Sequence, residues 1–325
     1  MSVKVAVIQD PPVLLDRTRT IEKAIALIGK AAGEGASLLV FPEAYVPGYP
    51  MWIWRLRPGG DMGLSGEIHA RLRQNAVDVA RGDLQPLQDA AARHRVALVV
   101  GINELDSRFS GTTLFNTVVV IGADGRLLNK HRKLMPTNPE RMVWGMGDAT
   151  GLRAVDTPAG RLGTLICWES YMPLARYALY AQNIEIYVAP TWDAGESWLA
   201  TMRHIAKEGG CWVIGTATAI QGQDIPDSFP ERDRLFPPDE WINDGDAIVV
   251  KPMGAVAAGP LHREKGILYA EIDPEAARRA RRSLDVCGHY SRPDVFSLSV
   301  SRRPLEPVHF DAHVTGTDPA DGPAA

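Results

Sequence analysis

The stretch RLGTLICWESYMPLA occupies residues 161–175 and places a thiol between two predicted elements. Its apolar run, residues 162–166, predicts a buried strand, and Pro173 suits the first position of a helix over residues 173–182. Cys167 therefore follows the end of a strand directly. In open α/β sheets, ligands bind beyond the carboxyl ends of the strands. The position of Cys167 makes it a candidate reactive group.

The same interleaving of strands and helices extends through most of the chain. Asp124-Gly125, flanked by extended runs at residues 116–121 and 126–129, is a strong hairpin signal, so we expect antiparallel as well as parallel pairing. Thr20 is expected to cap the first helix. Further strands are predicted over residues 3–8, 37–41, 96–102, 184–189, 212–216, 246–251 and 266–272, and helices over residues 20–32, 83–94 and 196–208. The pattern predicts an α/β fold with helices covering mixed sheets.

Two stretches depart from this pattern. Residues 221–241 are rich in Pro and Asp and predict an irregular insertion. From residue 302 onward the chain has no apolar period. We therefore predict one domain over residues 1–300 and a C-terminal tail over residues 301–325, either flexible or at an oligomer contact.

Composition and charge exclude several classes of protein. The chain has 325 residues, 45% of them hydrophobic, and a net charge of 35 − 39 = −4, which gives no indication of a nucleic-acid or membrane partner. No apolar run approaches the ~18 residues of a membrane span, and the N-terminus lacks a signal-peptide pattern. Three cysteines without CxxC spacing indicate neither a disulfide framework nor structural zinc. We expect a cytoplasmic protein with reduced thiols.

Three residues with different chemistry follow predicted strands. Glu43 comes after SLLVFP, Lys133 comes after the hairpin and Cys167 follows LGTLI. Each alone has a simpler interpretation: a capping carboxylate, one cation of a solvated basic run, and a small buried hydrophobic residue. Together they indicate a site.

An acid, an amine and a thiol in one place suit covalent catalysis at a carbon bonded to nitrogen. A helix N-terminus favours the thiolate form of a cysteine, so we expect Cys167 to be activated there. A nearby carboxylate can take its proton and later activate water. A lysine can stabilise the negative charge that develops on the attacked group.

Six ordered blocks of sequence resemble the nitrilase, or carbon–nitrogen hydrolase, superfamily and its true nitrilase branch in particular. They are FPEAYVPGYP (41–50), HRKLMPTNPERMVWGMGD (131–148), CWESYMPLARYALYAQ (167–182), APTWD (189–193), MRHIAKEGGCWVI (202–214) and DVCGHYSRPDVF (285–296). The resemblance implies a four-layer αββα sandwich, with Glu43 as general base, Lys133 as the charge-stabilising amine and Cys167 as nucleophile. Glu140 would orient the lysine and the substrate.

The sequence departs from the pattern of the true nitrilases at two positions. Ser170 stands where many of them carry Asn, and Ala149 stands where Gly is frequent. Both positions are expected at the edge of the pocket. The departures leave the triad chemistry intact but put the substrate preference in doubt.

The resemblance also implies the reaction, namely hydrolysis of a nitrile to a carboxylic acid and ammonia through thioimidate and thioester intermediates. No metal or organic cofactor is expected. Aromatic side chains near the strand ends predict a pocket for an apolar nitrile, aromatic or aliphatic. Trp52 and Trp54 have packing against neighbouring side chains as the simpler interpretation. The predicted substrate-binding residues are Tyr49, Trp168, Tyr171 and Trp192.

The sequence is compatible with two other kinds of function. An amidase, a carbamoyl hydrolase or a cyanide hydrolase on the same fold would carry the same triad. A non-catalytic, self-associating scaffold is a second alternative, which the presence of all three triad residues disfavours. The resemblance further implies a homo-oligomer, a dimer at least and in some relatives a spiral. Cys211, in an apolar strand, is expected to be structural, and Cys287 lies in a loop.

Overall fold

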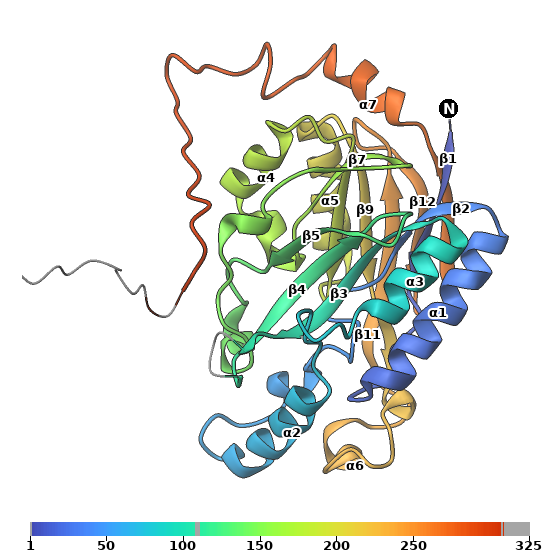
Figure 1. Ribbon diagram of the computed structural model, residues 1–325, viewed down its shortest axis with the longest axis vertical. Coiled ribbons are helices and arrows are strands. Elements are labelled where there is room, and N and C mark those ends of the chain that lie inside the picture. Colours follow the sequence, from blue (N-terminus) through green and yellow to red (C-terminus); the bar gives the residue numbers. More distant parts are fainter. Residues whose placement is uncertain (1, 108–110, 307, 309–325) are drawn as a thin grey trace, which may run out of the picture.

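The computed structural model describes residues 2–107, 111–306 and 308, and it contains two β-sheets packed face to face (Figure 1). In the first sheet, β1–β2 and β2–β3 are parallel and the other pairs antiparallel. Its strand order is β13 (Ile267–Ile272), β1 (Val3–Ile8), β2 (Ala36–Val40), β3 (Ala97–Leu105), β4 (Leu114–Ile121) and β5 (Leu127–Arg132). The predicted hairpin is the β4–β5 pair.

The second sheet is also mixed, with β7–β8 and β8–β9 parallel and the remaining pairs antiparallel. Its order is β10 (Ala219–Gln221), β11 (Trp241–Val250), β9 (Trp212–Ala217), β8 (Ile186–Thr191), β7 (Gly160–Thr164) and β6 (Val155–Thr157). One further strand, β12 (Val256–His262), pairs with β11.

Seven α-helices are described, and four of them form the two outer layers (Figure 1). They are α1 (Arg17–Gly33), α2 (Met62–Gln74), α3 (Gln85–His94), α4 (Pro173–Tyr180), α5 (Glu196–Glu208), α6 (Arg232–Leu235) and α7 (Pro274–Arg281). Helices α1 and α3 pack on the first sheet, and α4 and α5 pack on the second. The architecture is the expected αββα sandwich.

Alternation within the strands explains the layers. In β1, Val5 and Val7 join the core between the two sheets, whereas Ala6 and Ile8 face α1 and α3. Both faces of the strand are apolar because both are buried. Helix α5 contributes Trp198 and Met202 to the core on the outer face of the second sheet. The periodicity of the sequence therefore specifies which side of each sheet a residue covers.

Some predicted boundaries were wrong. Helix α1 begins one turn earlier than predicted, and Asp16 rather than Thr20 caps it by accepting from Arg19 N at 2.9 Å. Thr20 is buried, and its hydroxyl donates to Val13 O. The insertion at residues 221–241 is irregular apart from α6 and a short 3-10 turn. The polar helices α2 and α7, the short strands β6 and β10, and strand β12 were not predicted.

The segment after α7 runs outside the sandwich and past α4 (Figure 1). At the start of the predicted tail, Arg302 Nη2 donates to Leu152 O at 3.1 Å and Leu305 N donates to Asp148 Oδ2 at 2.9 Å. Residues 307 and 309–325 lie outside the described residues, and the division of the chain at residue 300 stays a prediction.

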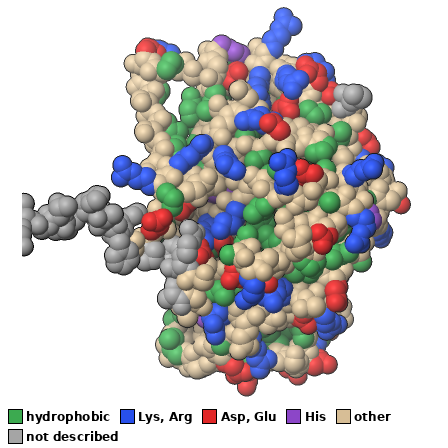
Figure 2. Space-filling model, viewed as in Figure 1, with side chains coloured by type: hydrophobic (Ala, Val, Ile, Leu, Met, Phe, Trp, Pro, Cys, Tyr) green, Lys and Arg blue, Asp and Glu red, His purple; other side chains and the backbone are tan. Residues whose placement is uncertain are grey.

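The surface carries charges of both signs, which are interspersed on the face drawn in Figure 2. Within the described part of the chain, every helix is too short or too polar to cross a bilayer.

Candidate active site

Glu43 lies in a turn that packs against the middle of β3. Phe41 N donates to Val99 O at 2.8 Å and Val46 N donates to Gly101 O at 3.1 Å, so both ends of the turn are tied to β3. A Cβ at Gly101 would lie 2.2 Å from Pro42 O and 2.5 Å from Ala44 N. The turn that carries Glu43 therefore approaches β3 more closely than any side chain there would allow.

Lys133 follows β5 directly and is held between two carboxylates. Its Nζ lies 2.8 Å from Glu43 Oε1 and 2.8 Å from Glu140 Oε2. All three side chains are buried. Asn116 on β4 makes two contacts here, since its carbonyl accepts from Lys133 N and its Nδ2 donates to Glu43 Oε1. The structure thus brings together three of the four residues predicted as catalytic.

Glu140 is fixed by its own short 3-10 turn (Asn138–Met142). Its Oε2 accepts from Thr137 N at 2.7 Å, and the Thr137 side chain accepts in return from the Glu140 backbone, which is a capping box. Its Oε1 accepts from the Tyr49 hydroxyl at 2.7 Å. Every oxygen of Glu140 is therefore engaged, and the carboxylate is anchored beside Lys133.

Cys167 begins a five-residue 3-10 turn (Cys167–Tyr171) that follows β7. Helix α4 starts at Pro173, six residues further on, so the prediction that the thiol lies at the N-terminus of that helix was wrong. The backbone at Cys167 has φ 54°, in the left-handed region. The Thr191 hydroxyl donates to Cys167 Sγ at 3.1 Å. Cys167 and Glu140 line the same cavity.

Glu169 connects the turn of Cys167 to the segment of Lys133. Its buried carboxylate accepts from Ile166 N at 2.6 Å and from Leu134 N at 2.8 Å, and it also contacts His131 Nε2 at 3.1 Å. One backbone donor precedes the thiol and the other follows the lysine. A single carboxylate therefore holds segments of both sheets at a fixed separation, a role that the CWE sequence alone did not indicate.

Burial and neighbouring charges shift the pKa values of both Glu43 and Lys133. Burial raises the pKa of Glu43 to about 7, against the lowering effect of Lys133. Burial lowers the pKa of Lys133, but the charges of Glu43, Cys167 and Glu140 outweigh it, so the net shift is upward and the amine stays protonated. Glu43 is therefore poised to exchange a proton near neutral pH.

Cys167 differs from the expectation of a thiol activated by its surroundings. Burial raises its pKa well above the usual range, the charge of Glu43 raises it further, and Lys133 and Thr191 only partly oppose this. The resting thiol is protonated. Of the neighbouring buried carboxylates, Glu43 has a pKa raised to about 7, so it can hold a proton near neutral pH.

The cavity beside Cys167 has a volume of about 240 Å³ and mainly aromatic walls. Tyr49 and Trp192 stack with ring centroids 4.3 Å apart and an interplanar angle of 3°. The lining residues are Tyr49, Trp54, Thr137, Glu140, Cys167, Trp168, Trp192 and Asp193. Three of the four predicted substrate-binding residues are among them.

Tyr171 is the exception, because it does not line the cavity. Its ring packs edge to face against Trp168 and against Trp198 of α5. Trp54, Thr137 and Asp193 also line the cavity and were not predicted from the sequence. Asp193 accepts from Trp168 Nε1 at 2.8 Å and so fixes a pocket wall. Its place directly after Trp192 at a strand end was the only signal for it.

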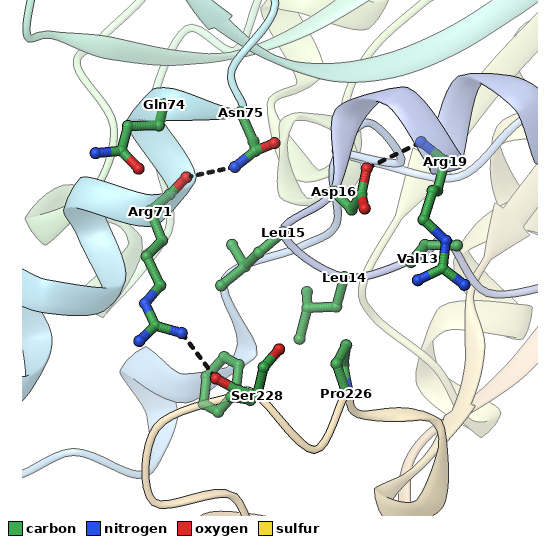
Figure 3. A pocket seen from close by; sticks show the side chains of 11 residues that line it. Val13, Leu14, Leu15, Asp16, Arg19, Arg71, Gln74, Asn75, Pro226 and Ser228 are labelled. Carbon is green, nitrogen blue, oxygen red and sulfur yellow. Dashed lines mark hydrogen bonds between the residues drawn. The ribbon is translucent and has the colours of Figure 1, made fainter.

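A second cavity, of about 180 Å³, lies between the start of α1, the end of α2 and residues 226–229 (Figure 3). Its polar groups are used in local contacts, since Arg71 donates to Ser228 O and Asp16 caps α1. It contains no thiol and no lysine. The candidate active site is therefore the cavity beside Cys167.

The other two thiols lie outside the cavity beside Cys167. Cys211 is fully buried in the core on the outer face of the second sheet, as predicted, and Cys287 is half-buried near Tyr177 O. Among residues 2–107, 111–306 and 308, no three His, Cys, Asp or Glu side chains are grouped to hold a metal ion.

Comparisons with known proteins agree with this site. The carbon–nitrogen hydrolase family model matches residues 4–282. An aliphatic nitrilase of Sinorhizobium fredii (strain HH103) is 42% identical, over 94% of this chain and 97% of its own. A bifunctional nitrilase/nitrile hydratase of Lupinus angustifolius is 39% identical over 97% and 90%, and nitrilase 2 of Arabidopsis thaliana is 38% identical over 96% and 92%.

Solved structures show the same fold at lower identity. A member of branch 10 of the nitrilase superfamily from Saccharomyces cerevisiae has a TM-score of 0.69 at 21% identity, covering 89% of this chain and 96% of its own. A carbon–nitrogen hydrolase from Helicobacter pylori G27 has a TM-score of 0.67 at 22% identity, covering 90% and 97%. The family match and the near full-length nitrilase relatives together show that this chain belongs to the carbon–nitrogen hydrolase family, in its nitrilase branch.

Proposed function

We propose that this protein is a nitrilase that converts an organic nitrile and two waters into a carboxylic acid and ammonia, with Cys167 as the nucleophile. The observation that carries the proposal is the buried Glu43–Lys133–Glu140 cluster next to a thiol that opens into an aromatic cavity. The names of the relatives, which include an aliphatic nitrilase, support a nitrile as substrate.

The first half of the reaction forms a covalent adduct. Glu43 takes the Cys167 proton, the sulfur attacks the nitrile carbon, and Glu43 passes the proton to the nitrile nitrogen, which gives a thioimidate and leaves Glu43 deprotonated. Glu43 then activates a water, which adds to the same carbon. The resulting tetrahedral intermediate expels ammonia and leaves a thioester.

The second half releases the acid. A second water, again activated by Glu43, attacks the thioester carbon, and the electron pair of the breaking C–S bond returns to sulfur. Lys133 stays protonated throughout and stabilises the negative charge on the attacked group, while Glu140 holds the lysine in place. The apolar walls limit access of bulk water and favour neutral, apolar nitriles.

A nitrile panel assayed for ammonia release tests the proposal, with the matching amides as competitors. Nitriles should turn over faster than amides, and Cys167→Ala should lose at least about 10³-fold in kcat, whereas Cys211→Ala and Cys287→Ala should retain activity. Faster turnover of amides would instead favour an amidase on this fold. Equal labelling of all three thiols by an electrophilic nitrile, without turnover, would support a non-catalytic scaffold.

We further propose that the chain forms a homo-oligomer. Apolar side chains are exposed on the segment after α7, with Phe296 77%, Tyr290 66% and Val295 55% exposed. Such a strip is unusual on a monomer surface. Sedimentation of the full chain should show a species of at least twice 35.4 kDa, and a monomer alone at working concentration would contradict the proposal.

A further inference from the structure

The catalytic thiol needs groups that favour its thiolate, and among the candidates known from sequence only Lys133 supplies a favourable charge. The helix α4 is six residues away. The charge of Lys133 is shared between Glu43 and Glu140, which both approach it to 2.8 Å. The two carboxylates repel a negative sulfur.

One neutral group in direct contact with the sulfur favours its charged form. The Thr191 hydroxyl lies 3.1 Å from Cys167 Sγ. Thr191 is the last residue of β8 and is 1% exposed, so water does not compete for this contact. A hydrogen bond to a charged acceptor is stronger than one to a neutral acceptor, and this contact therefore favours the thiolate over the thiol.

The backbone orients the Thr191 hydroxyl toward the sulfur. Asp193 N donates to Thr191 Oγ1 at 2.9 Å. A hydroxyl has one hydrogen to donate and two lone pairs. Because Asp193 N occupies one lone pair, the hydroxyl hydrogen is directed to the remaining neighbour, which is Sγ. Asp193 N–H thus donates to the Thr191 hydroxyl, which in turn donates to Cys167 Sγ. Neither hydrogen bond has to change direction when the sulfur becomes charged.

We propose that Thr191 is a catalytic residue of this site, whose hydroxyl donates to the Cys167 sulfur both when the thiolate attacks and when it leaves. In the attack, the thiol proton passes to Glu43 and the sulfur carries the charge until the C–S bond forms. In the last step, the C–S bond breaks, the electron pair returns to sulfur and the acid departs. The inference rests on the proposed nucleophile Cys167.

Three variants test the role of the hydroxyl. Thr191→Val keeps the shape and removes the donor, Thr191→Ser keeps the donor, and Thr216→Val is the matched control. Thr216 lies on the neighbouring strand β9, is equally buried, and donates to Ile8 O at 2.7 Å instead of to the sulfur. The readout is the rate of Cys167 alkylation by iodoacetamide at pH 8, which is proportional to the thiolate fraction and is followed by mass spectrometry of the Cys167 peptide.

Thr191→Val should lower the alkylation rate of Cys167 at pH 8 about 10- to 100-fold, because loss of a hydrogen bond to a charged group lowers the thiolate fraction by roughly that much. The kcat on a nitrile should fall about 10- to 100-fold with little change in KM. Thr191→Ser and Thr216→Val should keep the alkylation rate of the parent chain. An unchanged rate in Thr191→Val would overturn the proposal, as would an equal loss in Thr216→Val.

Two precautions keep the test decisive. If Thr191→Val does not fold, as judged by circular dichroism, Thr191→Ala is measured in the same way, with the same outcomes. Alkylation needs no nitrile turnover, so the two proposals can fail separately. A lower alkylation rate in Thr191→Val, in a chain that hydrolyses no nitrile, would refute the proposed function and leave the role of Thr191 intact.

Discussion

Asn116 Nδ2 donates to Glu43 Oε1 at 2.6 Å, the same oxygen that Lys133 contacts. The other oxygen, Oε2, is buried and has no hydrogen-bond partner among the described residues. Two donors thus fix one side of the carboxylate and leave the other side free. The free oxygen is the one that can receive the Cys167 proton and later bind a water.

Removing the hydrogen bond from Asn116 to Glu43 should shift the acidic limb of the pH profile of kcat/KM. Asn116→Ala takes away a donor that lowers the pKa of Glu43, so we expect that pKa to rise by about 1 unit or more. The acidic limb of kcat/KM should move up in pH, with a larger loss at pH 6 than at pH 8. Measurement of kcat/KM across pH 5–9 checks this.

Asn129→Ala is the matched control for Asn116→Ala. Asn129 is also nearly buried, but its Nδ2 donates to Gly151 O, away from the catalytic cluster. The acidic limb of kcat/KM for Asn129→Ala should lie at the same pH as in the parent chain. A loss of activity in Asn116→Ala that is uniform across pH would show that Asn116 acts only on packing.

The raised pKa of Glu43 also predicts how stability depends on pH. Burial raises that pKa from 4.5 to about 7, so between these values the folded state holds a proton that the unfolded state has lost. Stability therefore falls as pH rises through this window, by up to ~3 kcal/mol. Glu43→Gln removes this dependence, and its unfolding free energy, relative to the parent chain, should increase from pH 4.5 to pH 8.

Glu104→Gln is a control, because the stability contribution of Glu104 changes in a different pH range. Burial raises the pKa of Glu104, but hydrogen bonds and charges of Arg132 and Lys130 outweigh it and lower the pKa below 4.5. Its contribution is present above pH 4.5 and is lost as pH falls below it. Urea unfolding at pH 4.5, 6 and 8 should show a sloping difference for Glu43→Gln and a level one for Glu104→Gln.

The close approach of the turn that carries Glu43 to Gly101 predicts the effect of adding a methyl group there. In Gly101→Ala the added Cβ meets the backbone of the turn that carries Glu43 at 2.2 Å, so the turn must move. We expect a loss of about 1–3 kcal/mol in stability and of about 10²-fold in kcat. Gly66→Ala, on the exposed side of α2 with no atom within 4 Å of its Cβ, should instead gain about 0.5–1 kcal/mol and keep its activity.

Thermal denaturation and the steady-state kinetics of the two glycine variants separate these effects. A normal kcat in Gly101→Ala would show that the turn accommodates a methyl group without displacing Glu43. Equal destabilisation in both variants would show that the clash at Gly101 does not determine the result.

Periodicity of the sequence predicted an α/β fold with helices covering mixed sheets, and the resemblance supplied the four layers, but neither predicted the protonation of the thiol. A strand that is apolar at successive positions, as β1 is from Val5 to Ile8, needs a cover on both faces of its sheet. The strand that ends before Cys167 was predicted for the same reason. The 3-10 turn that separates Cys167 from α4 was not, because five residues of turn and the first turn of a helix have the same composition.

The parts of the site that sequence could not supply are contacts between distant segments. Lys133 and Glu43 are 90 positions apart, and the protonation of each depends on their distance and on burial, which no local pattern records. Trp54 was read as a packing residue because an aromatic side chain in a WIW run gives no indication of which way it points. It faces the cavity, and its Nε1 donates to the Tyr49 hydroxyl at 3.0 Å.

The Tyr49 hydroxyl connects the aromatic wall to the catalytic cluster, and this suggests how to separate binding from chemistry. It donates to Glu140 Oε1, and burial raises its pKa so that it keeps its proton. Tyr49→Phe retains the ring that stacks on Trp192 but removes the donor from a buried carboxylate. We expect kcat to fall about tenfold or more with KM little changed, whereas Tyr49→Leu should raise KM as well because the stack is lost.

Tyr171→Phe is the matched control, since that hydroxyl lies 3.4 Å from Asp193 Oδ2 and Tyr171 does not line the cavity. It should change kcat and KM less than about threefold. Steady-state kinetics on one neutral nitrile check all three variants. If Tyr49→Phe raised KM and left kcat unchanged, the hydroxyl would serve substrate binding alone, and Glu140 would not depend on it to hold Lys133 in place.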